Sequence, residues 1–384
     1  MPQLAFPLTT YRARLTDVQA RMRAAGLDAM VITMPDAVHW LTGVDSVGYL
    51  WPQGLVVPAD EGGQPVFVTR TTEQPGVDAC SWLTERRFYD ISVTDPVDAL
   101  IDAVAEAGFG NTRLGLETDA FTMLPSTYLR IVEAFPDAKF SDCSYIVPEA
   151  RLVKTEAELA YQRQAAAIAD HAMRQVLAEV RPGVSELELA GIAARALGEA
   201  GGEHAAIPPM VVSGERSALV HCMAGRRVLG RGDVVCIELA GVVNRYHAVL
   251  MRTAVIGTPN PRVQEVAELQ KQAHLAAVAR TAPGVAVHEP EDAAREVLEP
   301  AGLHANRCHR IGYSLGVAYP PGWLEPMTMV QGDEHVFVPG MSFTVEPNLH
   351  LPEEGFGLKL GETVECTADG PRSMTTLDHD IFVV

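Results

Sequence analysis

The sequence lacks the cysteine patterns and long apolar runs that mark secreted, zinc-binding and membrane proteins. Its six cysteines are scattered and form no Cys-x-x-Cys pair, so neither a disulfide framework nor a cysteine-based metal site is indicated. No stretch approaches the roughly 18 apolar residues that a membrane-spanning helix requires. No basic segment followed by an apolar one marks a signal peptide near Met1. We therefore expect a cytoplasmic protein that binds no membrane.

Positive charge is also scarce. Lys and Arg together number 30 against 49 Asp and Glu, which gives a formal net charge of −19. Nucleic acids and anionic membrane surfaces are bound by clustered Lys and Arg, so we expect no nucleic-acid partner. A small-molecule substrate is the expected partner. The acidic balance favours a cationic substrate only weakly, because many soluble proteins are acidic.

The length of 384 residues and the 47% share of hydrophobic residues predict two domains with packed cores. In the first part, helical patterns over residues 12–25 and 96–107 alternate with strand patterns over 29–33 and 112–116. Residues 59–63 read as the turn of a hairpin. This order predicts an α/β domain with a mixed sheet over residues 1–147.

The second part, residues 150–384, contains an internal repeat. Pro182-Gly183-Val184 recurs as Pro283-Gly284-Val285, and Ala193-Ala194-Arg195 recurs as Ala293-Ala294-Arg295. Each copy belongs to a helix pair that leads into strands, and capping boxes at Thr155-x-x-Glu158 and Ser185-x-x-Glu188 open the first two helices. The repeat predicts an α+β domain of two pseudo-twofold halves, with a site that draws residues from both.

Four segments of the second part carry candidate chemistry. In residues 232–253, Glu238 and Val249 stand eleven positions apart within a framework of Gly232-Asp233, Tyr246 and Arg252-Thr253. The later segments are His309-Arg310-Ile311-Gly312-Tyr313, then Gly340–Pro347 with Glu346, and Gly357–Thr363 with Gly361 and Glu362.

In these segments the sequence resembles the pita-bread family, which includes prolidase, aminopeptidase P, methionine aminopeptidase and creatinase. Residues 1–145 resemble the amino-terminal domain that creatinase, prolidase and aminopeptidase P share. The resemblance implies a pita-bread catalytic domain. The family's metallopeptidases bind two cations through Asp, Asp, His, Glu and Glu, and the matching positions here are Glu238, Val249, Tyr313, Glu346 and Gly361.

Only two of those five positions are carboxylates. A hard or borderline dication requires about four to six donors, so we expect no metal and no other cofactor. A single weakly bound metal on Glu238, Glu346 and Glu362 is the alternative.

Within the family, the closer resemblance is to ectoine hydrolases, the metal-free branch that opens a cyclic amidine. It is carried by Ile237–Val242, Arg245–Thr253, Gly312-Tyr313 and Tyr319-Pro320-Pro321-Gly322-Trp323. The sequence departs from that branch at Met251, where a polar Ser is usual, and at Glu346-Pro347-Asn348, which is more like the peptidases.

The resemblance also suggests catalytic roles. His221 ends a Ser-Gly-x-x-x-x-x-x-His segment that begins at Ser213, and an imidazole can move a proton near neutral pH. We expect Glu238 to attack the scissile carbon directly, as the resemblance implies, or to deprotonate a water. Glu346 and Glu362 are expected to hold a cationic group of the substrate or to raise each other's pKa. For Glu362, a charged residue at a strand end is the alternative.

Five aromatic or imidazole side chains are candidates for substrate binding: Tyr313, Trp323, Trp40, Tyr246 and His247. Tyr313 either donates a hydrogen bond to substrate or is satisfied by backbone. Trp323 follows two prolines in a rigid turn and is the expected pocket wall. Trp40 either closes the pocket or packs in a core. The family resemblance further implies a homodimer.

These observations lead to one primary hypothesis and two alternatives. The first is a metal-independent hydrolase of a C–N bond in a small cyclic or guanidino-type amino-acid derivative. The second is an Xaa-Pro dipeptidase or aminopeptidase-type peptidase with a remodelled metal site. The third is a non-catalytic, peptidase-like binding protein.

Overall fold

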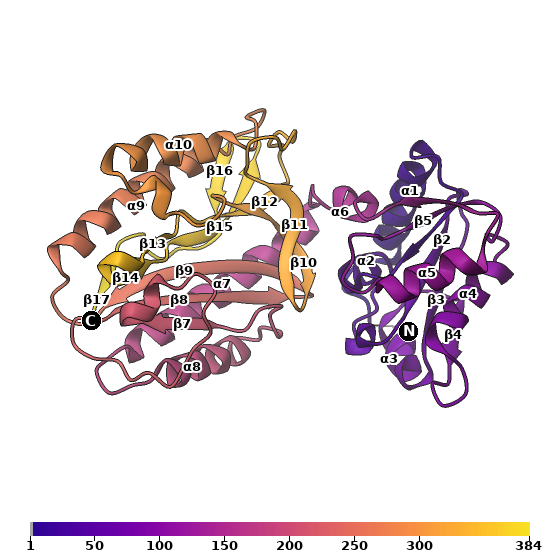
Figure 1. The fold of residues 1–384 in the computed structure, drawn as a ribbon, viewed down its shortest axis with the longest axis horizontal. Helices are drawn as coiled ribbons and strands as arrows, with labels where there is room; N and C mark the ends of the chain where they lie inside the picture. Colours follow the sequence, from indigo (N-terminus) through magenta and orange to yellow (C-terminus); the bar gives the residue numbers. More distant parts are fainter. Residues whose placement is uncertain (1–2) are drawn as a thin grey trace. The chain divides into compact units, whose positions relative to one another are not determined.

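The computed structural model describes residues 3–384 and divides the chain into two compact units, Met1–Arg151 and Leu152–Val384 (Figure 1). The boundary lies immediately after a short helix, α6 (Ile146–Ala150), which spans the boundary expected from sequence. None of the helices in the described residues is long and apolar enough to cross a membrane.

The first unit is an α/β domain with a mixed six-stranded sheet of order β4-β3-β2-β1-β5-β6. β2 pairs antiparallel with β1 and β3, and the remaining neighbours are parallel. Its strands are β1 (Ala29–Ile32), β2 (Gly54–Pro58), β3 (Val66–Arg70), β4 (Arg86–Tyr89), β5 (Arg113–Leu116) and β6 (Lys139–Asp142). Its other helices are α1 (Leu8–Ala24), α2 (Pro35–Thr42), α3 (Gln74–Cys80), α4 (Pro96–Glu106) and α5 (Pro125–Ala134). The predicted mixed sheet is confirmed.

The second unit begins with two long helices, α7 (Glu156–Glu179) and α8 (Glu186–Glu199), and a second pair follows, α9 (Pro261–Ala279) and α10 (Glu289–Leu298). Both predicted capping boxes form, because Thr155 and Ser185 each exchange hydrogen bonds with the Glu three residues later. α7 and α8 therefore start where local sequence chemistry satisfies their first free amide groups.

Strands follow each helix pair and join one sheet whose main path runs β11-β10-β12-β15-β9-β8-β7. The first set is β7 (Met210–Ser213), β8 (Val234–Val243) and β9 (Tyr246–Val255). The second set on this path is β10 (Tyr313–Tyr319), β11 (Gly322–Thr328), β12 (Ser342–Val345) and β15 (Gly361–Thr367). β16 (Gly370–Ser373) and β17 (Phe382–Val383) flank it, and β13 (Leu349–Leu351) pairs with β14 (Phe356–Leu358). The helix-pair-then-strands order occurs twice, as the internal repeat predicts.

The β8–β9 hairpin determines which side chains face the site. Asn244 and Arg245 have positive φ values of 49° and 64° at its tip, as a two-residue hairpin turn of this kind requires. Glu238 pairs with Met251 and Ala240 with Val249, so these four side chains share one face. The other face, with Leu239 and Leu250, joins a core with residues of α7 and α8.

Candidate active site

A cavity of about 150 Å³ lies in the second unit. Strands and loops of both halves contribute to its wall, as expected for a site between repeats. It is lined by Ile207, Met210, Val220, His221, Glu238, Met251, His309, Arg310, Tyr313, Trp323, Leu324, Glu346, Asn348 and Lys359. Five of the residues predicted from sequence are thus brought together: His221, Glu238, Tyr313, Trp323 and Glu346.

A buried ion pair forms part of the wall of this cavity. Glu238 on β8 accepts a hydrogen bond from the Nζ of Lys359, which lies between β14 and β15, at 2.5 Å. Burial alone would lower the pKa of Lys359, but the charge of Glu238 and this hydrogen bond raise it overall. Lys359 is therefore a cation in the folded protein, fixed to one oxygen of the Glu238 carboxylate.

Glu346 follows β12 and is a second buried carboxyl group. Burial and the neighbouring charge of Glu238 raise its pKa to about 8, although Lys359 and Arg310 act in the opposite direction. Its Oε1 lies 3.9 Å from Nδ1 of His309, and its buried Oε2 has no hydrogen-bond partner among the described residues. At neutral pH this group is mostly a protonated acid, with one oxygen available to a bound molecule.

Tyr313 and Trp323 form a rigid polar edge of the cavity. The indole Nε1 of Trp323 donates to the Tyr313 hydroxyl at 3.0 Å, and Tyr313 is hydrogen-bonded to Glu346. Burial raises the pKa of Tyr313 well above its usual value, so the hydroxyl keeps its proton. Because its oxygen already accepts from Trp323, the hydroxyl proton is directed to another acceptor.

Imidazole and guanidinium groups complete the wall. His221 lies in an exposed turn after the short 3-10 helix η3 (Gly214–Ala218). His309 and Arg310 precede β10, and the Arg310 guanidinium lies 5.0 Å from the centre of the Tyr313 ring. Burial lowers the pKa of His309. The cavity therefore combines one fixed carboxylate, one neutral acid, two cations and two imidazoles.

The residues at the five metal-ligand positions do not fit a dinuclear metal centre. Val249 has no side-chain atom that can bind a metal ion. The ammonium group of Lys359 is hydrogen-bonded to Glu238, at the place where a metal ion would have to bind that carboxylate. A Cβ on Gly361 would lie 2.9 Å from the Cβ of Glu346 and 3.0 Å from the Sδ of Met251. The side chains of Glu346 and Met251 therefore occupy the space that a metal-binding side chain at position 361 would need. A dication would also meet the positive charge of Lys359, which disfavours its binding.

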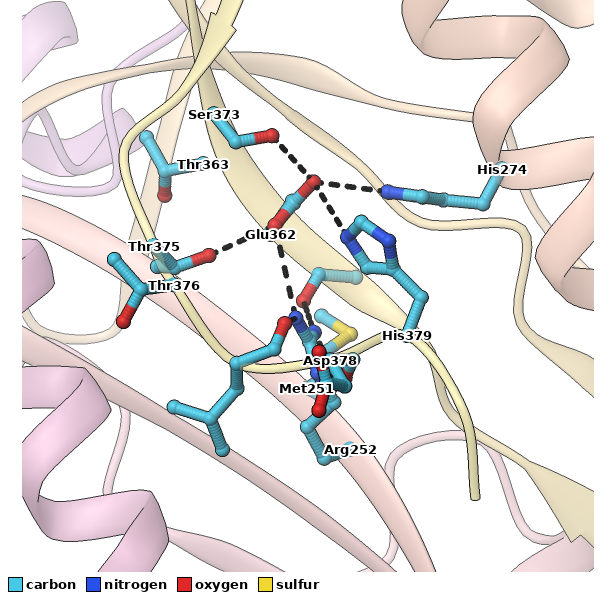
Figure 2. Close-up of polar contacts among 12 residues, drawn as sticks. Met251, Arg252, His274, Glu362, Thr363, Ser373, Thr375, Thr376, Asp378 and His379 are labelled. Atoms are coloured by element: carbon cyan, nitrogen blue, oxygen red, sulfur yellow. Dashed lines mark hydrogen bonds and ion pairs between the residues drawn. The ribbon is translucent and has the colours of Figure 1, made fainter. Parts of the chain in front are cut away.

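Glu362 does not lie in the cavity, and this corrects its expected pairing with Glu346. Gly361 pairs with Met251 on the cavity face, whereas Glu362 pairs with Leu250 and projects to the opposite face of β15. Its carboxylate bonds instead to His274, His379, Ser373 and Thr375 (Figure 2). Those hydrogen bonds outweigh burial and lower its pKa. It therefore neither raises the pKa of Glu346 nor contacts a molecule in the cavity.

Tyr246 and His247 also lie outside the cavity wall. The Tyr246 hydroxyl donates to Glu158 at 2.7 Å. His247 is fully buried, accepts from the amide of Ala206 at 2.9 Å, and donates to the Arg245 carbonyl at 2.8 Å. Burial lowers its pKa to about 4. Both side chains therefore support the hairpin instead of lining the site.

Trp40 lies in the first unit, where its ring packs in a core. It is 5% exposed, and the Arg14 guanidinium lies 4.7 Å from its ring centre while donating to its carbonyl at 2.8 Å. Of the two alternatives for Trp40, the core role is the one observed within this unit.

Four polar residues of the wall were missed by the sequence reasoning: Lys359, Arg310, His309 and Asn348. All four occur in the segments that carry the family resemblance, two to four residues from Tyr313, Glu346 or Gly361. Asn348 donates to the sulfur of Met251 at 3.3 Å and accepts from the amide of Leu360 at 3.0 Å. The signal that could have identified Lys359 is its positive charge two residues before Gly361, within the segment Gly357–Thr363.

The chain matches two family models over most of its length. Residues 160–368 match metallopeptidase family M24, and residues 14–153 match the creatinase/prolidase N-terminal domain.

Individual relatives agree with these two matches. An ectoine hydrolase from Halomonas elongata is 27% identical over 409 residues, covering 100% of each chain. An Xaa-Pro dipeptidase from Pyrococcus furiosus is 30% identical over 244 residues, covering 64% of this chain and 69% of that one. Among solved structures, dipeptidase PepE from Mycobacterium ulcerans is 28% identical, with a TM-score of 0.84 and 99% coverage of both chains. The protein is therefore a hydrolase of metallopeptidase family M24 with a creatinase/prolidase amino-terminal domain.

Proposed function

We propose that this hydrolase cleaves a C–N bond in a small cyclic amidine or guanidino-type amino-acid derivative without using a metal. The observation that supports it most strongly is the Lys359–Glu238 ion pair, at 2.5 Å, in the position of a metal ligand. The similarity to an ectoine hydrolase over the full length of both chains points the same way. The cavity volume of about 150 Å³ suits a molecule of amino-acid size.

In the proposed mechanism, Glu238 is the nucleophile. Lys359 holds one of its oxygens, and the other attacks the amidine carbon. The C–N bond breaks as the departing nitrogen takes a proton from His221, which leaves the carbon bonded to the Glu238 oxygen. A water then gives a proton back to His221 and adds to that carbon, which releases product and restores Glu238.

The remaining wall groups bind and orient the substrate. Glu346, with a pKa of about 8, donates as a neutral acid to a developing negative charge, and the hydrogen bond from Tyr313 orients Glu346. The Arg310 guanidinium is suited to a substrate carboxylate. Trp323 supplies a flat apolar wall. Glu362 is not part of this mechanism.

The second candidate is an Xaa-Pro dipeptidase with a remodelled site. It is favoured by the 30% identity to the Pyrococcus furiosus dipeptidase and by retention of Glu346. It requires a different source of carbonyl activation, because Val249 and Gly361 supply no ligand atoms. We further propose a cytoplasmic homodimer on the basis of composition and family resemblance.

The test is turnover of ectoine, creatine and Xaa-Pro dipeptides by purified protein, with Glu238→Gln and His221→Asn as variants. We expect hydrolysis of a cyclic amidine or guanidino compound, a loss of at least about 100-fold in kcat for both variants, and a mass adduct on the peptide that contains Glu238. Hydrolysis confined to Xaa-Pro dipeptides would contradict the substrate class. Full activity of Glu238→Gln would contradict the mechanism.

A further inference from the structure

A second cluster of chemically capable side chains lies on the opposite face of β15 from the cavity. Figure 2 shows His274 from α9 and His379 from the carboxy-terminal segment directed at the carboxylate of Glu362. The Nε2 atoms of both histidines lie 3.0 Å from Oε1 of Glu362. The three potential donor atoms all lie within 4.8 Å of one another. Three separate elements thus converge on one point.

The donor set is the type that zinc prefers. Two imidazole nitrogens and one carboxylate oxygen, with a fourth position left to water, is an established zinc arrangement in proteins. His274 and Glu362 have side-chain exposures of 0% and 1%, whereas His379 is 24% exposed. The cluster is therefore closed on the protein side and open on the side of His379, which leaves a route for an ion and a water.

The surroundings of Glu362 hold its carboxylate in place. Ser373 donates to Oε1 at 2.7 Å, and Thr375 donates to Oε2 at 2.8 Å. Arg252 lies 3.6 Å from Oε2 and also donates to the carbonyls of Leu377 and Asp378, both at 2.8 Å. Outer groups of this kind orient a ligand carboxylate for a metal.

The local charge balance permits a cation. Arg252 is the positive group beside Glu362, and Lys271 pairs with Asp380 at 2.7 Å. Five carboxylates act on these two cations: Glu362, Asp170 and Asp378 on Arg252, and Asp378, Asp380 and Glu268 on Lys271. Carboxylates therefore outnumber the two cations around the cluster.

We propose that His274, Glu362 and His379 bind one divalent transition metal ion, best matched by Zn²⁺, at a site separate from the cavity. The two N–H···O hydrogen bonds give way to metal–ligand bonds, and both imidazole nitrogens bind in their unprotonated form. At zinc–ligand distances of about 2.0–2.1 Å, donor atoms on one ion lie no more than about 4 Å apart, so the three side chains close slightly around it.

The ion fastens the carboxy-terminal segment to the sheet. His379 is the ligand from that segment, while α9 and β15 supply the other two. Metal binding to the folded state then stabilises it by mass action. This site does not depend on the proposed function, because Glu362 projects to the face of β15 opposite the cavity.

The experiment is zinc binding by the full chain after exhaustive chelation, followed by metal analysis, calorimetry and thermal unfolding. We expect about one Zn²⁺ per chain and a rise in Tm on adding zinc. His379→Gln, at the partly exposed position, is expected to weaken binding by at least about 10-fold, since even the loss of an outer partner of a ligand costs that much, and His274→Gln should do the same. Cobalt substitution should give the visible absorption of a four-coordinate site.

Two controls make the result specific. His335→Gln removes an imidazole that pairs with Asp333 elsewhere, and Glu238→Gln alters the cavity; both should keep zinc binding. No uptake by the wild type, or unchanged uptake in folded His379→Gln and His274→Gln, would overturn the proposal. Loss of zinc in Glu238→Gln alone would place the ion in the cavity, and would contradict both this site and the metal-free mechanism.

Discussion

Lys359 is the residue that most changes what the cavity can bind. Its ammonium group lies 2.5 Å from Glu238 and also raises the fraction of ionised Glu346 through its charge. A bound cation and this ammonium compete for the same carboxylate. Lys359 therefore supplies the cavity with a positive charge that belongs to the protein itself, and no set of metal ligands is required to hold that charge.

Replacement of Lys359 by Met is expected to destabilise the protein and abolish turnover. The substitution leaves the Glu238 carboxylate buried without its partner, and breaking a buried pair from one side costs about 3–5 kcal/mol. Lys359→Arg keeps the charge and should retain most of both properties. Urea unfolding at pH 7 and kcat measure the two effects. A Met variant as stable and active as the Arg variant would show that the ion pair has neither role.

His247 is expected to make stability depend on pH. Burial lowers its folded-state pKa from 6.5 to about 4, despite the hydrogen bond to the Arg245 carbonyl, and Arg245 and His204 also lower it. Between these values the unfolded chain binds a proton that the folded chain does not. The free energy of unfolding therefore falls by up to about 1.36 kcal/mol for each unit as the pH decreases from 6.5 towards 4.

The His247→Gln variant should show a shallower decrease over that window, measured by urea unfolding at several pH values. His171→Gln, which removes an exposed imidazole from α7, is the matched control. If the wild type and His247→Gln lost stability in parallel between pH 6.5 and 4, His247 would not be the titrating group.

Motif spacing correctly predicted those cavity residues that lie in a strand or at its end. It failed where the prediction depended on which face of a strand a side chain projects from. Glu238, Tyr313 and Glu346 were identified because each occupies a quoted ligand position. Glu362 was misassigned because it is one residue past such a position, and a single step along β15 reverses the direction of the side chain. Lys359 meets Glu238 from 121 residues away, and local spacing carries no information on such a contact.

At the scale of the element, the β8–β9 hairpin depends on a close approach to α7. A Cβ on Gly241 would lie 1.9 Å from the carbonyl oxygen of Ala165 in that helix. Gly241 therefore lets the strand that carries Glu238 pack directly on the helix backbone. The capping boxes that start α7 and α8 were predicted from sequence because they involve residues only three positions apart. The approach of Gly241 to α7 involves distant segments and was not predicted.

Gly241→Ala should cost about 3 kcal/mol or more of stability and reduce activity, because backbone must move to admit the methyl group. The control is Gly191→Ala in α8, where nothing lies within 4 Å of the new Cβ. That exposed helix position should gain roughly 0.5–1 kcal/mol. Thermal and urea unfolding compare the two variants. Equal stabilities would contradict the role of close packing at Gly241.

At the scale of the whole molecule, the two halves of the second unit supply different parts of the cavity. The first half provides Glu238 and Met251, and the second provides Tyr313, Glu346 and Lys359. The internal repeat was visible in the sequence, and so was the family. The substrate was not, because the cavity shape results from contacts among segments that lie far apart in the chain.

The most direct test of the account is turnover of the cyclic amidine or guanidino substrate that the protein hydrolyses, measured for the wild type and for His379→Gln after exhaustive chelation, with residual metal measured in each sample. His379→Gln is included so that an ion at the cluster on the opposite face of β15 is not mistaken for a catalytic one. For chelated protein with less than about 0.05 metal ions per chain, the account predicts a kcat/KM within about twofold of that of the untreated protein. A twofold change is well below the factor of 10 that corresponds to 1.4 kcal/mol. Loss of turnover on chelation, with recovery on adding Mn²⁺ or Co²⁺, would contradict it.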